Sequence, residues 1–357
     1  MTFTVPFNVL TYNVFAFPKI IENVAQNKRL SLIIKKIHEY DSETSIDVVS
    51  FNELWDDSER DFVIKGMRDI GFKYESGILP RHPLKLLNGG VQIFSKWPIT
   101  TVDWITYTKC TNEDCLASKG GLYTRIIKTY NGGEYAFNVI GTHLNVGSTG
   151  KTQQLSQITE LKQLISKWSA RQSAKEPFVI LGDLNVNKFT NTAHYEKMLS
   201  ILGFKDTTDI KFSTQSTNTA RRKPATSLEN KTTGLLDYII WDNGTNVKGT
   251  CRNLYKEFRL ITPLNNIPYC PGELGKGYVY SDCETNDRYI YDLSDHDPIF
   301  GEFNVSFDYN DVKAISSKDA RDITLETLHI IGTWIPTLLA LYLVYKLVMA
   351  FYSFVSK

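Results

Sequence analysis

The chain has 357 residues, of which 42% are hydrophobic, and its formal net charge is +1. This length is enough for one large hydrophobic core, or for one domain with an appendage. Because acidic and basic residues nearly balance, the composition excludes a strongly basic protein that binds nucleic acid in bulk, and we expect no nucleic-acid partner.

Apolar runs alternate with amphipathic segments along the chain, which predicts alternating strands and helices. Strands are expected over residues 7–14, 47–53, 90–95, 101–107, 121–130, 135–143, 178–181, 235–241 and 299–307. Helices are expected over residues 27–40, 58–69, 153–168 and 193–202. Polar composition predicts a surface loop over residues 211–231, and Pro, Gly and Tyr predict an irregular hairpin over residues 261–292. Together these elements predict one domain over residues 1–307.

The last fifty residues differ from this domain in composition. Residues 308–328 are expected to form a polar linker, and residues 329–355 an apolar helix. The uncharged run up to Tyr345 would be about 24 Å long as a helix, and extension through Lys346 reaches the ~30 Å of a hydrocarbon core. We expect a transmembrane helix rather than an amphipathic helix on the protein or the membrane. Since no signal peptide precedes the domain, the expected protein is tail-anchored with its domain in the cytosol.

The five cysteines show no CxxC spacing, which argues against a zinc site. Cys110 and Cys115 could bridge a short loop, and Cys270 and Cys283 could bridge the expected hairpin. Free thiols in a reducing compartment agree with the sequence at least as well. The sequence therefore leaves the disulfide state open.

Polar residues recur at the ends of otherwise apolar strands. In the stretch from Phe178 to Asn185, four apolar residues precede Gly182, and the two-residue spacing of Asp183 and Asn185 directs both side chains to the same side. Asp and Asn are also common turn residues, so this stretch alone does not distinguish a turn from a site. The pattern is repeated at other strand ends, by Asn13, Glu53, His143, Asp237, Asp295 and His296.

This set of side chains is complementary in its chemistry. The two imidazoles offer an acid and a base, the carboxylates offer oxygen ligands for a hard cation, and the amides can position a phosphate or a water molecule. Such a set predicts metal-assisted phosphodiester hydrolysis. No Ser-His-Asp or Cys-His arrangement and no Walker-type glycine-rich loop competes with this interpretation.

In this order, the segments resemble the endonuclease/exonuclease/phosphatase family, which includes deoxyribonuclease I, apurinic endonucleases and neutral sphingomyelinases. The matching segments are Leu10-Thr11-Tyr12-Asn13, Asn52-Glu53, Gly141-Thr142-His143-Leu144, Gly182-Asp183-Leu184-Asn185, Leu236-Asp237-Tyr238 and Ser294-Asp295-His296. The resemblance implies a four-layer α/β/β/α sandwich, as in deoxyribonuclease I, with the site at one rim of the paired sheets. It also implies a Mg²⁺ site formed by Glu53, with Asn13 close by and Asp295 in the same cluster.

The resemblance implies roles for the remaining positions. His296 would be the general base that activates water, oriented by Asp237. Asp183 and Asn185 would position the nucleophile and the phosphate. His143 would stabilise the developing charge or protonate the leaving group.

Four features are similar to sphingomyelinases within this family. Residues 10–14 followed by Phe17-Pro18 resemble the start of bacterial sphingomyelinases, and Asp114 with Lys119 resembles the Asp/Lys switch segment of neutral sphingomyelinases. The resemblance implies that Lys119 could reach the substrate phosphate. Residues 277–280 resemble the aromatic membrane-contacting hairpin of the bacterial enzymes, and the apolar C-terminal helix would hold the domain at the bilayer. Each feature also has a structural explanation, as a solvated loop charge or as packing of the hairpin.

The leading hypothesis is a membrane-tethered, Mg²⁺-dependent phosphodiesterase of phospholipase C type. It would hydrolyse sphingomyelin, or a related membrane sphingophospholipid, to ceramide and phosphocholine. A nuclease or inositol-phosphate phosphatase on the same fold is the first alternative, and the near-neutral charge argues against the nuclease. A membrane-anchored lipid-binding module without activity is the second, and the filled catalytic positions argue against it.

Overall fold

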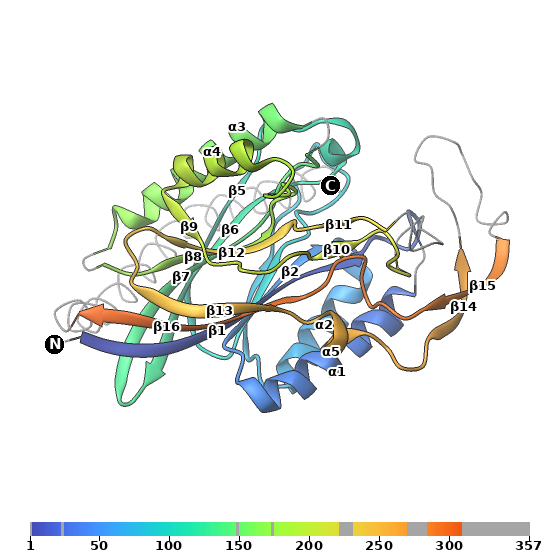
Figure 1. Ribbon diagram of the computed structural model, residues 1–357, viewed down its shortest axis with the longest axis horizontal. Coiled ribbons are helices and arrows are strands. Elements are labelled where there is room, and N and C mark those ends of the chain that lie inside the picture. Colours follow the sequence, from blue (N-terminus) through green and yellow to red (C-terminus); the bar gives the residue numbers. More distant parts are fainter. Residues whose placement is uncertain are drawn as a thin grey trace, which may run out of the picture.

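Two mixed β-sheets form the centre of the molecule (Figure 1). The computed structural model describes residues 2–22, 25–147, 150–172, 175–220, 231–269 and 284–308. The first sheet contains, in spatial order, β13 (Val247–Asn253), β16 (Ile299–Asp308), β1 (Thr2–Ala16), β2 (Val48–Leu54), β4 (Gln92–Ser95) and β3 (Tyr74–Ile78). The second contains β5 (Ile99–Thr106), β6 (Gly120–Tyr130), β7 (Gly133–His143), β8 (Phe178–Asp183), β12 (Asp237–Asp242) and β9 (Phe204–Asp206).

Helices cover the outer face of each sheet, on opposite sides of the molecule (Figure 1). The first sheet carries α1 (Gln26–Thr44), α2 (Asp57–Asp69) and α5 (Tyr255–Phe258). The second sheet carries α3 (Lys151–Ser169) and α4 (Thr192–Leu202). Smaller elements are the 3₁₀ helix η1 (Asn112–Leu116) and the pairs β10 (Thr214–Gln215) with β11 (Thr233–Gly234), and β14 (Leu264–Tyr269) with β15 (Glu284–Ile290).

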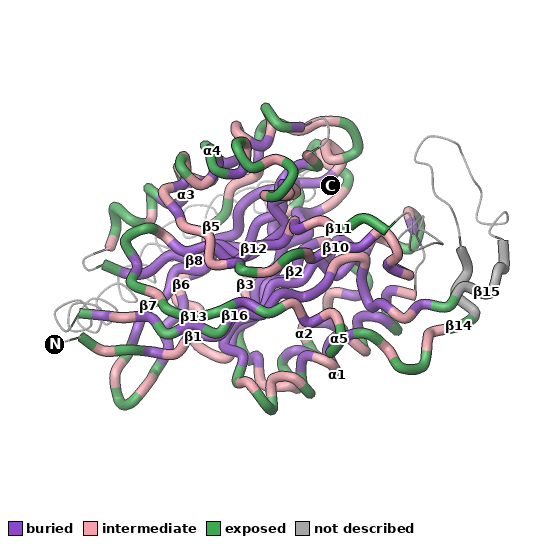
Figure 2. The backbone as a smooth tube through the Cα atoms, viewed as in Figure 1, coloured by how far each residue is buried: buried purple, intermediate pink, exposed green. Residues whose placement is uncertain are grey.

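Three hydrophobic clusters hold these layers together. One lies between the two sheets, where the ring of Phe7 stacks on Phe137 at a centroid distance of 3.8 Å and meets Trp241 edge-on. The second lies between the first sheet and its helices, and the third between the second sheet and its helices. Figure 2 shows the resulting pattern, with buried residues along the central strands and exposed residues on the outer faces of the helices. The expected α/β fold with two sheets is confirmed.

The pairing of the central strands brings polar side chains to one edge. β1 is parallel to β2, with Asn13 opposite Asn52, and β7 is parallel to β8, with His143 opposite Asp183. β12 is antiparallel to β8, so its first residue, Asp237, lies opposite Asp183. β16 is antiparallel to β1, and the segment that precedes it therefore meets the end of β1. Strands distant in the sequence thus begin or end at one place.

Gly182 permits the close approach of β8 to β7. Its φ is +151°, and a Cβ at this position would lie 1.9 Å from the carbonyl oxygen of Thr142. We expect Gly182→Ala to destabilise the fold by about 3 kcal/mol, from backbone strain and a clash that backbone atoms cannot relieve. Gly132→Ala is the matched control, because Gly132 also has a positive φ but no atom of the described part of the chain lies within 4 Å of its added Cβ. Equal unfolding temperatures for the two variants would contradict this account.

The expected helices and strands agree with the structure apart from shifts at their ends. The structure also contains strands that were not expected, and their sequence patterns are weak. β3, β9 and β13 are short or lie at a sheet edge. Most residues of β13 are exposed or half-buried, so the sequence lacks the alternation that marks a half-buried strand. The prediction of a surface loop over residues 211–231 was wrong for the described part of that range, because Ser213, Thr214, Gln215 and Asn218 are buried.

The expected tail anchor and cytosolic domain were also wrong. Among the described residues, none of the helices combines the length and the apolar character that crossing a membrane requires. The expected linker and apolar helix over residues 308–355 lie outside the described residues, apart from Asp308. Cys110 and Cys115 form a disulfide, whereas a cytosolic domain would keep them reduced. Cys270 and Cys283 are outside the described residues.

Candidate active site

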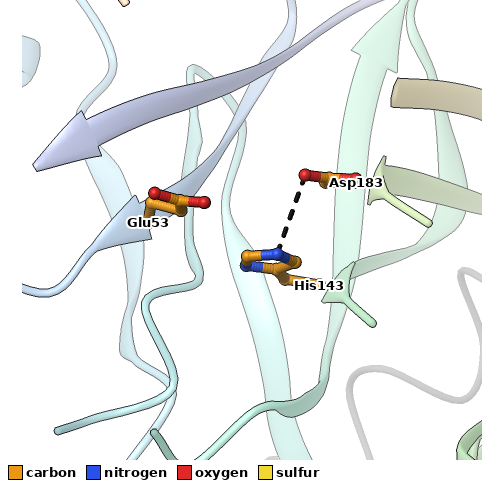
Figure 3. A group of neighbouring side chains, drawn as sticks. All are labelled: Glu53, His143 and Asp183. Carbon is orange, nitrogen blue, oxygen red and sulfur yellow. Dashed lines mark ion pairs between the residues drawn. The ribbon is translucent and has the colours of Figure 1, made fainter. Parts of the chain in front are cut away.

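The structure brings the expected site residues together where the strands end. Two groups of side chains place their ligand atoms within 4.8 Å of one another: Glu53, His143 and Asp183, and Asp183, Asp237 and His296. Figure 3 shows the first group, which converges from three strands onto the space between the sheets. Asp183 belongs to both groups and is therefore the centre of the site.

Glu53 and Asn13 form the part of the site best suited to a cation. The amide of Asn13 donates to Oε1 of Glu53 at 2.9 Å and to Oδ2 of Asp183 at 3.2 Å. Burial, with the nearby charge of Asp295, raises the pKa of Glu53 to about 8. Glu53 also has a left-handed backbone, with a φ of 58°, which is a strained conformation typical of functional sites.

Several buried carboxylate oxygens here have no hydrogen-bond partner among the residues that the structure describes. They are Oε2 of Glu53, Oδ1 of Asp237 and Oδ1 of Asp295. An unpartnered buried carboxylate is costly, because the oxygen has lost its water without gaining a donor. Oxygen atoms of this kind are the ligands that hard divalent cations prefer. The residues present therefore fit a divalent cation held by Glu53, with Asp295 and Asn13 beside it.

His296 and Asp237 form a hydrogen-bonded pair next to this position. Nδ1 of His296 lies 2.7 Å from Oδ2 of Asp237, and its Nε2 lies 3.7 Å from Oδ2 of Asp183. Burial alone would lower the pKa of His296, but the carboxylates of Asp237 and Asp183 raise it well above its usual value. Burial and the charge of Asp237 raise the pKa of Asp183 to about 7. The pair fixes the imidazole so that Nε2 faces Asp183.

Lys119, His143 and Asn185 form a second hydrogen-bonded group. Nε2 of His143 lies 3.0 Å from Nζ of Lys119 and 3.0 Å from Nδ2 of Asn185. Both partners are donors, so Nε2 accepts, and the neutral ring carries its proton on Nδ1. Burial, together with the charge of Lys119, holds the pKa of His143 well below its usual value. Asp114 anchors the lysine through an ion pair of 2.6 Å.

Two residues that shape the site, Trp55 and Arg29, were not predicted from the sequence. The ring of Trp55 stacks on His143 at a centroid distance of 5.7 Å. Arg29 is fully buried and donates to the carbonyl oxygens of Val14 and Phe15 at the end of β1 and of Leu293 before β16. Its position on the apolar face of the predicted helix was the available signal, because a charge rarely occupies such a position.

All nine side chains expected at the site are thus placed by the structure at this edge: Asn13, Glu53, Lys119, His143, Asp183, Asn185, Asp237, Asp295 and His296. The aromatic segment over residues 277–280, expected near the membrane, lies outside the described residues. The arrangement combines a cation site, an oriented imidazole and a buried lysine. These groups can bind a phosphate and transfer a proton beside it.

Two curated proteins are similar to this chain in sequence. Sphingomyelinase C of Leptospira interrogans is 30% identical over 215 residues, which are 54% of this chain and 36% of the relative. Sphingomyelinase C of Bacillus cereus is 29% identical over 215 residues, covering 54% of this chain and 62% of the relative. The chain therefore matches between about a third and three fifths of the length of these relatives.

The fold is shared with solved structures. A beta toxin variant from Staphylococcus aureus with bound magnesium ions has a TM-score of 0.63 and 22% identity, and the match covers 83% of this chain and 99% of the toxin. At this identity the likeness concerns the fold. The sequence profile of the Endonuclease/Exonuclease/phosphatase family matches residues 10–296, which include all the site residues named above. The chain belongs to the Endonuclease/Exonuclease/phosphatase family.

Proposed function

We propose that this chain is a Mg²⁺-dependent phosphodiesterase of phospholipase C type. Its substrate is sphingomyelin or a related sphingophospholipid, and its products are ceramide and phosphocholine. The observation that carries the proposal is the buried cluster in which His296, Asp237 and Asp183 lie beside Glu53 and Asn13. The choice of lipid and metal is supported by relatives named Sphingomyelinase C and by a related fold with bound magnesium.

Glu53, Asp295 and Asn13 would hold the cation. The unpartnered oxygens of the two carboxylates supply ligand atoms, and the Asn13 amide keeps the Glu53 carboxylate in place. When bound, Mg²⁺ neutralises negative charge on the phosphoryl oxygens of the substrate. The protein's contribution is a set of buried carboxylate oxygens, one carboxylate of which is held by the Asn13 amide.

His296 acts as the general base. Asp237 accepts a hydrogen bond from Nδ1–H, so Nε2 is the atom that accepts a proton from the attacking water. The two carboxylates make this nitrogen more basic than an ordinary imidazole. Asp183 lies 3.7 Å from Nε2 and can accept a second hydrogen bond from the same water, which fixes its direction of attack.

Lys119 would bind the phosphate. Its ammonium is buried and lies beside His143, while Asp114 and the carbonyl of Leu144 restrict its position. A fixed positive charge in a buried site stabilises the charge that develops on the phosphoryl and leaving oxygens. Asn185 shares the His143 contact and orients the ring.

A headgroup-release assay tests the proposal. Purified protein is incubated with vesicles of sphingomyelin, phosphatidylcholine or a phosphoinositide, and in parallel with supercoiled plasmid. We expect phosphocholine from sphingomyelin in Mg²⁺, background release in EDTA, and recovery when Mg²⁺ is restored. Plasmid nicking without headgroup release would favour a nuclease, lipid binding without turnover would favour an inactive module, and full activity in EDTA would exclude the metal site.

A further inference from the structure

Large apolar side chains stand exposed on the loop between β3 and β4. Leu84 is 88% exposed and Leu86 is 69% exposed. Single exposed apolar residues are common on soluble proteins, but two leucines two positions apart in one loop form a local apolar tip. Further exposed apolar residues, Ile20, Val146 and Phe189, follow the strands whose ends carry site residues.

The loop is held in a defined shape. The amide of Lys85 donates to the carbonyl of His82 at 2.9 Å, which closes a turn with Pro83 and Leu84 at its tip. Proline is favoured at this turn position because its φ is already fixed. The amide of Leu86 donates to the carbonyl of Leu116 in η1 at 2.9 Å. The leucines are therefore presented outward by a hydrogen-bonded turn.

The loop is also joined to the catalytic lysine through η1. Nζ of Lys85 donates to the carbonyl of Cys115 at 2.7 Å, within the loop closed by the Cys110–Cys115 disulfide. Asp114, in the same segment, pairs with Lys119 and accepts from the amide of Val146 at 2.6 Å. The loop that carries the two leucines is thus hydrogen-bonded to the same segment that holds Lys119, the lysine proposed to contact the phosphate.

We propose that Leu84 and Leu86 form a bilayer-contact site that inserts into the interface of a sphingomyelin-containing membrane. This inference rests on the proposed function, since a lipid phosphodiester must reach Lys119 from a bilayer. Arg81 is exposed three residues before Leu84, so its guanidinium can meet a headgroup phosphate while the leucines enter the apolar layer. Along the chain the contact is far from the paired strands β14 and β15, which project from the body of the molecule (Figure 1).

The test compares two forms of one substrate. In the double variant Leu84→Ser/Leu86→Ser, we expect turnover of sphingomyelin in zwitterionic vesicles to fall at least about tenfold, because apolar burial at the interface is lost. Turnover of a short-chain sphingomyelin kept below its micelle concentration should stay within about twofold. Val102→Ser/Trp104→Ser is the matched control, because these two exposed residues also stand two apart but lie on edge strand β5.

A second readout does not depend on catalysis. An environment-sensitive fluorophore on Leu84→Cys should shift to the blue when vesicles are added, and one on Val102→Cys should not. Unchanged vesicle turnover with no blue shift would overturn the proposal. A parallel loss on monomeric substrate, or an equal loss in the β5 control, would also overturn it. If the unmodified protein cleaves neither substrate, the proposed function fails, and the fluorescence shift still decides whether the tip binds the bilayer.

Discussion

Replacing His296 with Gln is expected to lower kcat for sphingomyelin hydrolysis by about 10³- to 10⁴-fold. The substitution keeps a side chain whose amide can donate a hydrogen bond to Asp237, but removes the nitrogen that takes the proton from water. KM should change little, since the proposed phosphate contacts come from Lys119 and the cation site. Initial rates at saturating Mg²⁺ measure the effect.

His38→Gln provides the matched control, because His38 is an exposed histidine on α1 outside the site. Its kcat should equal that of the unmodified protein. The unfolding temperature of both variants should be recorded, so that a loss of structure is not mistaken for a loss of chemistry. A His296→Gln enzyme that keeps more than a tenth of the original kcat would show that another group is the base.

Glu53→Gln should separate activity from stability. We expect kcat/KM to fall roughly 10²- to 10³-fold and the Mg²⁺ concentration for half-maximal activity to rise, because a charged ligand oxygen is lost. The metal-free protein should nevertheless become more stable, by about 1 to 3 kcal/mol at pH 7. Burial raises the pKa of Glu53 from its usual value to about 8, so folding opposes the charged form of this carboxyl.

The direction of this effect depends on pH. A carboxyl whose pKa is higher in the folded protein weakens folding increasingly as pH rises from about 4.5 towards 8, so Glu53→Gln should gain stability over this range. Mg²⁺ should stabilise the unmodified protein but have little effect on the variant. Glu134→Gln, at an exposed position of β7, is the control. A less stable metal-free Glu53→Gln would mean that the carboxylate supports the fold without a cation.

The sequence was most informative where strands end at the site. Asn13, His143 and Asp183 could be placed near one another because each closes an apolar run, and parallel strands deliver such residues to the same edge. Asp237 and His296 could not be placed by this rule, because Asp237 is the first residue of β12 and His296 precedes the start of β16. Their order along the chain and the family resemblance supplied what periodicity alone did not.

Features that depend on tertiary contacts were not predictable in this way. The stacking of Trp55 on His143 and the three carbonyl contacts of Arg29 join segments far apart in the sequence. The tail-anchor prediction failed for a different reason. It relied on local hydropathy alone. The sequence did not decide between a Cys110–Cys115 disulfide and free thiols, and the disulfide in the structure argues against a reducing compartment.

The pairing of β1 with β16 has a consequence for how the protein is synthesised. Thr2 lies opposite Asp308, and Leu10 opposite Phe300, so the first strand of the domain is completed by its last. Asn13 and His296 therefore cannot meet on the ribosome until nearly three hundred residues have been synthesised. During that interval the nascent chain contains most of its strands but lacks the assembled site. The edge of β1 that later pairs with β16 is also unpaired. The protein should therefore depend on chaperones during synthesis more than its finished stability suggests.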